Sequence, residues 1–83
     1  MKVKDIKYST SDKRTSIKCK IKEVGIRHWF ETQILIWKDG SLDGIVTTKH
    51  KEYLISTDEI KEILNKTCDK NPELNDIVAK DLI

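Results

Sequence analysis

Two cysteines and two histidines are the side chains in this sequence most able to bind a metal or act in catalysis: Cys19, His28, His50 and Cys68. No two of them have the short Cys-x-x-Cys or His-x-x-x-His spacing that structural zinc sites normally use at least once. Cys68 is expected just after a helix end, where nothing lowers its pKa, and no glycine-rich phosphate-binding loop occurs. Acidic residues are spread over expected exposed helix faces. We therefore predict no metal site, no cofactor and no enzymatic activity.

A second set of residues could bind an anion. Residues 17–22, Ile-Lys-Cys-Lys-Ile-Lys, alternate apolar and basic side chains, which predicts a strand with one buried face and one lysine-bearing face. Aromatic rings stack exposed bases and lysines hold phosphates, so lysines and tryptophans sharing a sheet face are typical of a nucleic-acid-binding surface. The predicted binding residues are Lys13, Arg14, Lys18, Lys20, Lys22, Arg27, Trp29, Gln33 and Trp37.

The alternative is that the two tryptophans are covered. Trp29 and Trp37 could pack under an N-terminal arm, under the second helix or in a dimer interface, with lysine side chains lying over the rings. Three further apolar residues on the same expected face favour this alternative, since such a face is seldom left in water: Leu35, Leu42 and Val46.

Charge is unevenly distributed along the chain. Residues 1–30 hold nine basic and three acidic side chains, a net charge of +6, whereas residues 31–83 hold seven basic and eleven acidic ones, a net charge of −4. This division indicates a basic patch for an anionic partner and an acidic opposite side. Lysine-rich sequence is also common in AT-rich genomes, which is the alternative explanation.

Strands are predicted over residues 2–8, 16–24, 28–38, 41–49 and 52–55, with a polar loop over residues 9–16. Gly25-Ile26 predicts a two-residue type II′ turn, and Asp39-Gly40 predicts a two-residue type I′ turn. The first turn pairs Ile21 with Phe30, and the second pairs Ile34 with Ile45. These registers define an inner face of Ile17, Cys19, Ile21, Phe30, Thr32, Ile34, Ile36, Ile45 and Thr47. The predicted outer face comprises Lys18, Lys20, Lys22, Trp29, Glu31, Gln33, Leu35, Trp37, Leu42, Val46 and Thr48.

Two helices are predicted after the strands, over residues 57–67 and 72–82. Ser56 and Glu59 form a capping box at the start of the first helix, and Asn71-Pro72 is typical of the start of the second helix. The first helix has an apolar stripe of Ile60, Ile63, Leu64 and Thr67, and the second has Leu74, Ile77, Val78 and Leu82. The first should cover the inner sheet face; the second either completes that cover or packs on a second subunit. The fold class is therefore α+β: one domain, residues 1–83, with an antiparallel sheet of three to five strands followed by two C-terminal helices.

Composition limits the setting of the protein. A chain of 83 residues is near the lower size at which one core is stable, and its charged content of 36% makes a homodimer a reasonable expectation. Two cysteines without a signal peptide or a long apolar run predict a reducing, cytoplasmic location and no membrane association.

Residues 17–66 resemble the bacterial and phage relatives of positive coactivator four. The resemblance rests on Trp29 and Trp37 bracketing a strand, and on residues 54–59, Leu-Ile-Ser-Thr-Asp-Glu, leading into a helix. It implies single-stranded DNA binding on a curved antiparallel sheet and dimerisation through the helix. In style, the chain also resembles small phage-encoded inhibitors of host defence systems, which are often single α+β domains with asymmetric charge.

The function expected from the sequence is non-enzymatic binding of single-stranded nucleic acid. The alternative is a small inhibitor that binds and blocks a host protein of defence or nucleic-acid handling, which an acidic, helix-borne face would favour.

Overall fold

The computed structural model describes residues 1–82, with side chains described through Val78. Five strands form one antiparallel sheet in the order β1-β2-β3-β4-β5, and two helices follow. The elements are β1 (Lys2–Thr10), β2 (Arg14–Lys22), β3 (Phe30–Trp37), β4 (Leu42–Thr47), β5 (Glu52–Leu54), α1 (Thr57–Lys70) and α2 (Leu74–Leu82). The predicted α+β class is confirmed.

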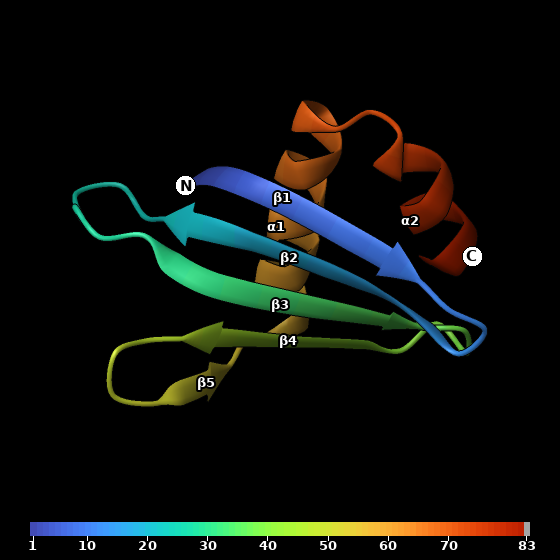
Figure 1. The fold of residues 1–83 in the computed structure, drawn as a ribbon, viewed down its shortest axis with the longest axis horizontal. Helices are drawn as coiled ribbons and strands as arrows, with labels where there is room; N and C mark the ends of the chain where they lie inside the picture. The colour runs from blue at the N-terminus through green and yellow to red at the C-terminus, as the bar shows by residue number, and fades with distance from the viewer. Residues whose placement is uncertain (83) are drawn as a thin grey trace.

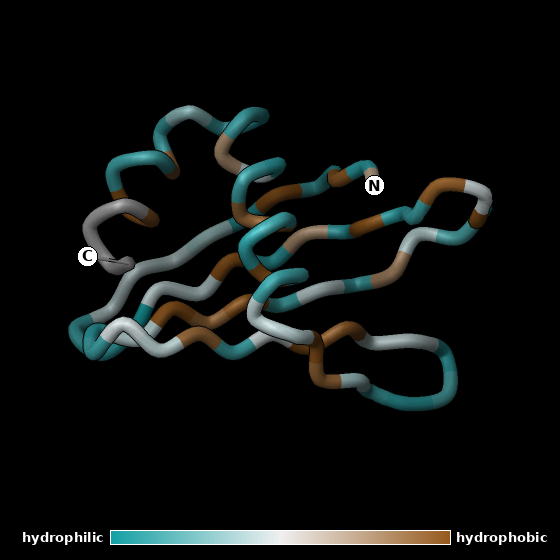
Figure 2. The backbone as a smooth tube through the Cα atoms, turned by 180° about the vertical axis from the view of Figure 1, so that it is seen from behind, coloured by the Kyte–Doolittle hydropathy of each residue, from teal (hydrophilic) through white to brown (hydrophobic). Residues whose placement is uncertain are grey.

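Both helices lie on the same face of the sheet, which leaves two layers (Figures 1 and 2). The buried side chains between the layers alternate along β2 and β3, as a strand with one covered face requires. The apolar core consists of Val3, Ile17, Cys19, Ile21, Ile34, Ile36, Ile60, Ile63, Leu64, Cys68, Leu74 and Val78. Phe30, predicted to be buried, is only half-buried, because it lies at the start of β3 and at the margin of this core.

Helix α1 crosses the sheet from β4 to β1. At its start the Ser56 hydroxyl accepts a hydrogen bond from the Glu59 backbone N–H at 3.2 Å, so the predicted N-cap is confirmed. At its end the Lys70 ammonium donates to the backbone carbonyl of Val3. The helix runs three residues further than predicted, so Cys68 lies inside it and not after its end.

Helix α2 begins at Leu74, later than predicted. Asn71 ends α1, donating its N–H to the Thr67 carbonyl, and is not the N-cap of α2. Pro72 lies in the connecting turn between the helices, because the Asn71 carbonyl accepts from the Leu74 N–H at 2.9 Å. Leu74 and Val78 are buried, so α2 completes the cover of the inner face; Leu82 lies outside the described side chains.

The first predicted register is confirmed, although its turn is different. Ile21 pairs with Phe30 and Ile17 with Ile34, as expected. The connection is not a two-residue turn: residues 23–29 form a loop in which the Ile26 N–H donates to the Glu23 carbonyl at 3.1 Å. Gly25 has φ +85° at the third position of that turn, a conformation that glycine adopts without steric cost.

The second predicted register is wrong by one residue. Ile34 pairs with Gly44 and Ile36 with Leu42, whereas the sequence predicted Ile34 with Ile45. The hairpin uses a three-residue loop in which Gly40 has φ +91°, and Trp37 pairs across it with Ser41. The extra loop residue exchanges the faces of β4. Leu42 and Val46 therefore pack against the core, and the residues on the outer face are Asp43, Ile45 and Thr47.

Gly44 allows α1 to approach β4 in this register. An added Cβ atom at residue 44 would lie 2.6 Å from the Ile55 Cγ1 atom and 2.7 Å from the Ile60 Cγ1 atom. Ile60 is 2% exposed and has little room to move. We therefore expect Gly44→Ala to lower the free energy of unfolding by about 1–3 kcal/mol, measured by urea denaturation. An unchanged midpoint would contradict this packing. Gly25→Ala is a comparison without any steric contact: its added Cβ meets nothing within 4 Å, so its loss of stability reports the cost of positive φ alone.

Strand β1 is longer than predicted, and the loop after it is shorter. β1 extends to Thr10 and β2 begins at Arg14, so only residues 11–13 remain of the loop predicted over residues 9–16. The polar side chains of that segment do not prevent pairing, because Ser9 and Thr10 are matched by Ser16 and Thr15 across the ladder. Thr15 is itself buried against the inner face.

Candidate nucleic-acid interface

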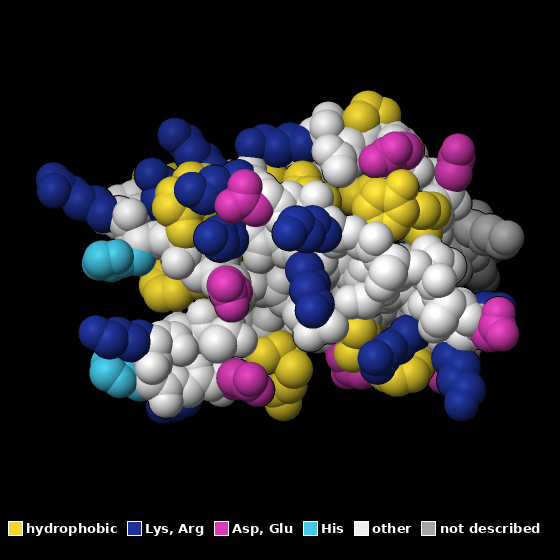
Figure 3. Space-filling model, viewed as in Figure 1, with side chains coloured by type: hydrophobic (Ala, Val, Ile, Leu, Met, Phe, Trp, Pro, Cys, Tyr) yellow, Lys and Arg dark blue, Asp and Glu magenta, His cyan; other side chains and the backbone are white. Residues whose placement is uncertain are grey.

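The outer face of the sheet is the side opposite both helices. In Figure 3, which views this face, lysine and arginine side chains gather over β1 and β2, with others near the loops. Along β2 the buried inner residues alternate with outward lysines, as predicted for Lys18, Lys20 and Lys22. The half of the outer face formed by β1 and β2 is the candidate interface.

Six lysines meet in pairs across these two strands. Lys2 pairs with Lys22, Lys4 with Lys20 and Lys7 with Lys18. We call these six residues the lysine ladder. Directly opposite side chains have Cβ atoms about 4.5–5.5 Å apart, and like charges at that spacing destabilise a sheet. The repulsion within this concentration of positive charge therefore works against the sheet.

Few acidic side chains offset the ladder. Asp5 Oδ2 lies 3.7 Å from Lys20 Nζ, and Glu31 is directly opposite Lys20 on β3. The Lys20 and Asp5 side chains are 43% and 58% exposed, so water screens this ion pair and it contributes little stability. Lys2, Lys7 and Lys18 are exposed.

A β-bulge places Lys7 on the outer face. The register of β1 against β2 shifts between Lys4 and Lys7, and Asp5 has φ +54° within that segment. Without the extra residue, strict alternation would turn Ile6 outward and Lys7 inward. With it, Ile6 packs against the core and Lys7 faces Lys18.

Trp29 lies under two members of the ladder. The Lys4 Nζ atom is 4.2 Å from the centre of the Trp29 ring, and the Lys22 Nζ atom is 5.3 Å from it. Both distances fall within the range of cation–π attraction. The ring is half-buried, and the lysines that cover it belong to the same sheet. This arrangement matches the alternative predicted from the sequence, in which lysine side chains lie over the tryptophan rings.

Trp37 and Gln33 also have partners on the sheet. The Arg14 guanidinium is 5.2 Å from the Trp37 ring, and the Trp37 indole N–H donates to Asp43 Oδ2 at 2.8 Å. The Gln33 amide donates to the Ser16 hydroxyl at 3.0 Å. These contacts fix both side chains, so a ligand would meet them already oriented.

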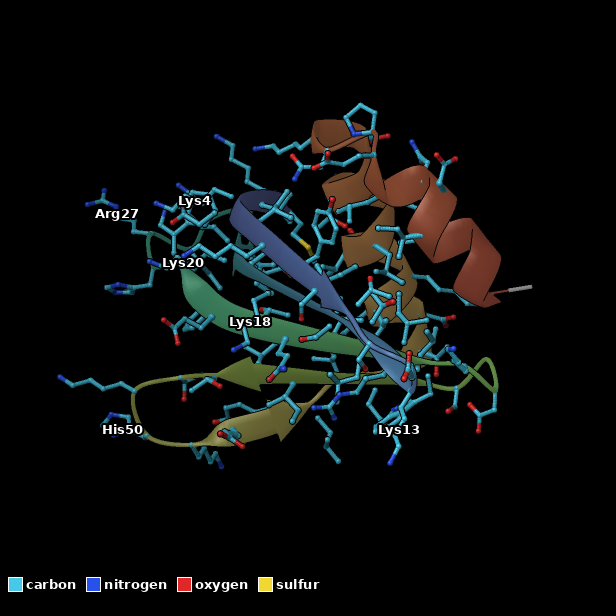
Figure 4. All side chains as sticks on the ribbon, turned by 45° about the vertical axis from the view of Figure 1, so that its right-hand side comes forward. Lys4, Lys13, Lys18, Lys20, Arg27 and His50 are labelled. Atoms are coloured by element: carbon cyan, nitrogen blue, oxygen red, sulfur yellow. The ribbon has the colours of Figure 1, made fainter. Side chains whose placement is uncertain are left out.

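The predicted binding residues are only partly brought together. Lys18, Lys20 and Lys22 share the outer face with Trp29, and Arg27 lies on the β2–β3 loop, at the same end of the sheet as Lys4 (Figure 4). Lys13 lies at the opposite end, in the β1–β2 turn, where its carbonyl accepts from the Lys38 N–H. Gln33 is directly opposite Lys18, and the pair Arg14 and Trp37 lies between them and that end.

The prediction missed Lys2, Lys4 and Lys7. Lys7 breaks the two-residue spacing of Lys2 and Lys4 at the bulge, so alternation alone does not place the three lysines on one face. Allowing for one inserted residue, the outward lysines of β1 match those of β2.

The two cysteines are buried thiols. Burial raises the pKa of Cys19 to about 11, and burial followed by the charge of Asp69 raises the pKa of Cys68. A raised pKa leaves less thiolate, the reactive form. Among the described residues, no group of three or more His, Cys, Asp or Glu side chains is placed to hold a metal ion. Within the same part of the chain, no helix has the length and apolarity needed to cross a membrane.

Comparison of the chain with protein-family models, with curated proteins and with solved structures finds no match.

Proposed function

We propose that this protein binds single-stranded nucleic acid on the outer face of its sheet and catalyses no reaction. The observation that supports the proposal best is the lysine ladder, three lysine pairs facing each other across β1 and β2. A polyanion would remove the repulsion between the paired ammonium groups, and each phosphate contact would release counterions from the strand.

The spacing of the ladder suits an extended strand. Alternate residues of a β-strand are about 6.5–7 Å apart, comparable to the phosphate spacing of an extended single strand. Trp29 lies at one end of the ladder, where Lys4 and Lys22 lie over its ring. This ring adds an aromatic group on which a base could stack. We propose that the resemblance to the single-stranded DNA-binding relatives of positive coactivator four reflects a shared function. We also propose a cytoplasmic location, where buried Cys19 and Cys68 would stay reduced.

The facing pair Lys7 and Lys18 provides the sharpest test of the ladder, because both side chains are exposed. Lys7→Gln/Lys18→Gln should raise the free energy of unfolding by about 0.2–1 kcal/mol, because one repulsive pair is removed. The same variant should bind a fluorescent single-stranded oligonucleotide about 3- to 10-fold more weakly by polarisation.

The matched control is Lys61→Gln/Lys66→Gln, which removes two positive charges from α1 on the other side of the molecule. The control should change affinity by less than about two-fold, since long-range attraction is screened over about 10 Å. Equal losses in the two variants would show that total charge, and not the ladder, determines binding.

A second candidate function, blocking another protein, is supported by the charge of the helix layer. Between residues 56 and 78, six exposed acidic side chains accompany three lysines: Asp58, Glu59, Glu62, Asp69, Glu73 and Asp76, with Lys61, Lys66 and Lys70. An acidic helical surface could occupy a basic site on a host protein that handles nucleic acid. Affinity purification from host lysate would test it, and loss of the captured protein with Glu59→Gln/Glu62→Gln would support it.

A homodimer remains a prediction. The apolar stripe of α2 offers little area to a second subunit, because Leu74 and Val78 are buried within one chain and Ile77 is half-buried. Sedimentation at micromolar concentration tests the dimer, and a single-chain mass would exclude it.

A further inference from the structure

A notch lies at the end of the sheet, where β3 begins and β4 ends. Pairing between β3 and β4 stops at Glu31 and Thr47. Beyond this pair the two segments separate into the β2–β3 and β4–β5 loops. Residues 28–31 form one wall and residues 47–50 the other, around a hollow of about 490 Å³. Figure 3 shows the notch open to solvent, with a histidine on each side of it.

The walls of the notch combine rings with hydrogen-bonding groups. Four of the eight lining residues carry aromatic rings, which could stack on a planar ligand: His28, Trp29, Phe30 and His50. Glu31 can accept a hydrogen bond from an amino group, and Lys49 can donate to a carbonyl or a phosphate. Pockets for small ligands have volumes of about 300–1,000 Å³, so the hollow has room for one planar group of this kind.

The β4–β5 wall is held in shape by Thr48. Its hydroxyl donates to the Lys51 carbonyl at 2.9 Å and accepts from the backbone N–H groups of His50 and Lys51 at 3.4 and 3.3 Å. These bonds close the loop on itself, so His50 and Lys49 are presented from a preformed turn and less entropy is lost when a ligand is bound.

Trp29 connects the notch to the lysine ladder. The same ring lines the notch and lies 4.2 Å from the Lys4 Nζ atom on the outer face. A strand whose phosphates lie along the ladder would therefore reach the notch without leaving the protein surface. The charge of the ladder and its continuity with the notch argue for a nucleotide of that strand over an unrelated small molecule.

We propose that the notch holds one nucleobase of the strand whose phosphates are bound by the lysine ladder. This inference rests on the proposed function and extends it, because it assigns a base-binding site beside the phosphate-binding face. The base would stack among the rings of residues 28–30 and His50, with Lys49 near its phosphate. Binding would then depend on the presence of bases as well as on charge.

The test compares two polymers with the same phosphates, a ten-residue oligothymidylate and a ten-residue abasic oligonucleotide, in polarisation titrations of the intact chain. Wild-type protein should bind the thymidylate at least about 5-fold more tightly, since stacking one base on aromatic groups contributes that much or more. His28→Ala/His50→Ala should lose most of this difference and bind the abasic polymer as the wild type does. Both histidines are exposed, so the replacement leaves the core intact.

Tyr53→Ala is the matched control, because Tyr53 is an exposed aromatic residue of β5 outside the notch, and it should leave both affinities unchanged. A second readout uses Trp37→Phe, in which Trp29 is the remaining tryptophan and its emission should change with thymidylate but not with the abasic polymer. Equal affinity of the wild type for both polymers would overturn the notch while leaving the ladder proposal intact. Salt-independent or absent binding of both would overturn the two proposals together.

Discussion

Replacing Lys18, Lys20 and Lys22 together by glutamine should weaken binding to a single-stranded oligonucleotide by about 10- to 100-fold at low salt. The three lysines contribute one side of the lysine ladder, and each is directly opposite a lysine of β1. Every lost phosphate contact should also reduce the dependence of affinity on salt, by about 0.7 in log–log slope for a single strand. The slope should therefore become shallower by about 2.

The fold should survive this triple replacement. The buried neighbours Ile17, Cys19 and Ile21 are untouched, and three repulsive lysine pairs are removed, so the midpoint of thermal unfolding should stay the same or rise. Lys51→Gln/Lys61→Gln/Lys66→Gln loses the same charge outside the ladder. A fall in affinity that is equal in both triple variants would contradict a localised site.

Ile34→Ala should lower the free energy of unfolding by about 2–5 kcal/mol. Ile34 is fully buried between the β-sheet and the helices, opposite Ile17 on β2 and Gly44 on β4. Domains have roughly 0.05–0.15 kcal/mol of stability per residue, so a chain of 83 residues has about 4–12 kcal/mol in total. The variant should therefore unfold at much lower urea concentration.

Ile45→Ala is the control that tests the register of β4. The same side chain is deleted at a half-buried position on the outer face, opposite Gln33, so the cost should be below about 1.5 kcal/mol. In the register predicted from the sequence, Ile45 would be opposite Ile34 in the core. Equal losses for the two variants would favour that predicted register over the observed one.

The β2–β3 register could be predicted because its signal is distributed over many residues. Six residues alternate apolar and basic from Ile17 to Lys22, and a one-residue slip would bury lysines, so the predicted pairing holds although the turn differs. The β3–β4 register could not be predicted in the same way. Both faces of β4 offer apolar residues, and the decision between them depends on whether Asp39-Gly40 closes a two- or a three-residue loop.

Half of the lysine ladder could be predicted, and the other half could not. Lys18, Lys20 and Lys22 follow from strict alternation, whereas Lys7 faces outward only because of the bulge at Asp5. A bulge is a single inserted residue with no distinctive sequence, and Asp5 adopts its positive φ without glycine. The contacts of the Trp29 ring could not be predicted either. The lysine closest to this ring, Lys4, is on β1, and β1 does not pair with β3, the strand that follows Trp29.

The most direct test of the account is the affinity of the wild-type chain for a single-stranded oligonucleotide, measured by polarisation between about 50 and 200 mM salt. If the six lysines of the ladder contact phosphates, the logarithm of the association constant should fall with the logarithm of salt concentration with a slope of about −4, and of about −2 if only one strand of the ladder is engaged. Absence of measurable affinity, or an affinity that does not change with salt, would contradict the proposed function.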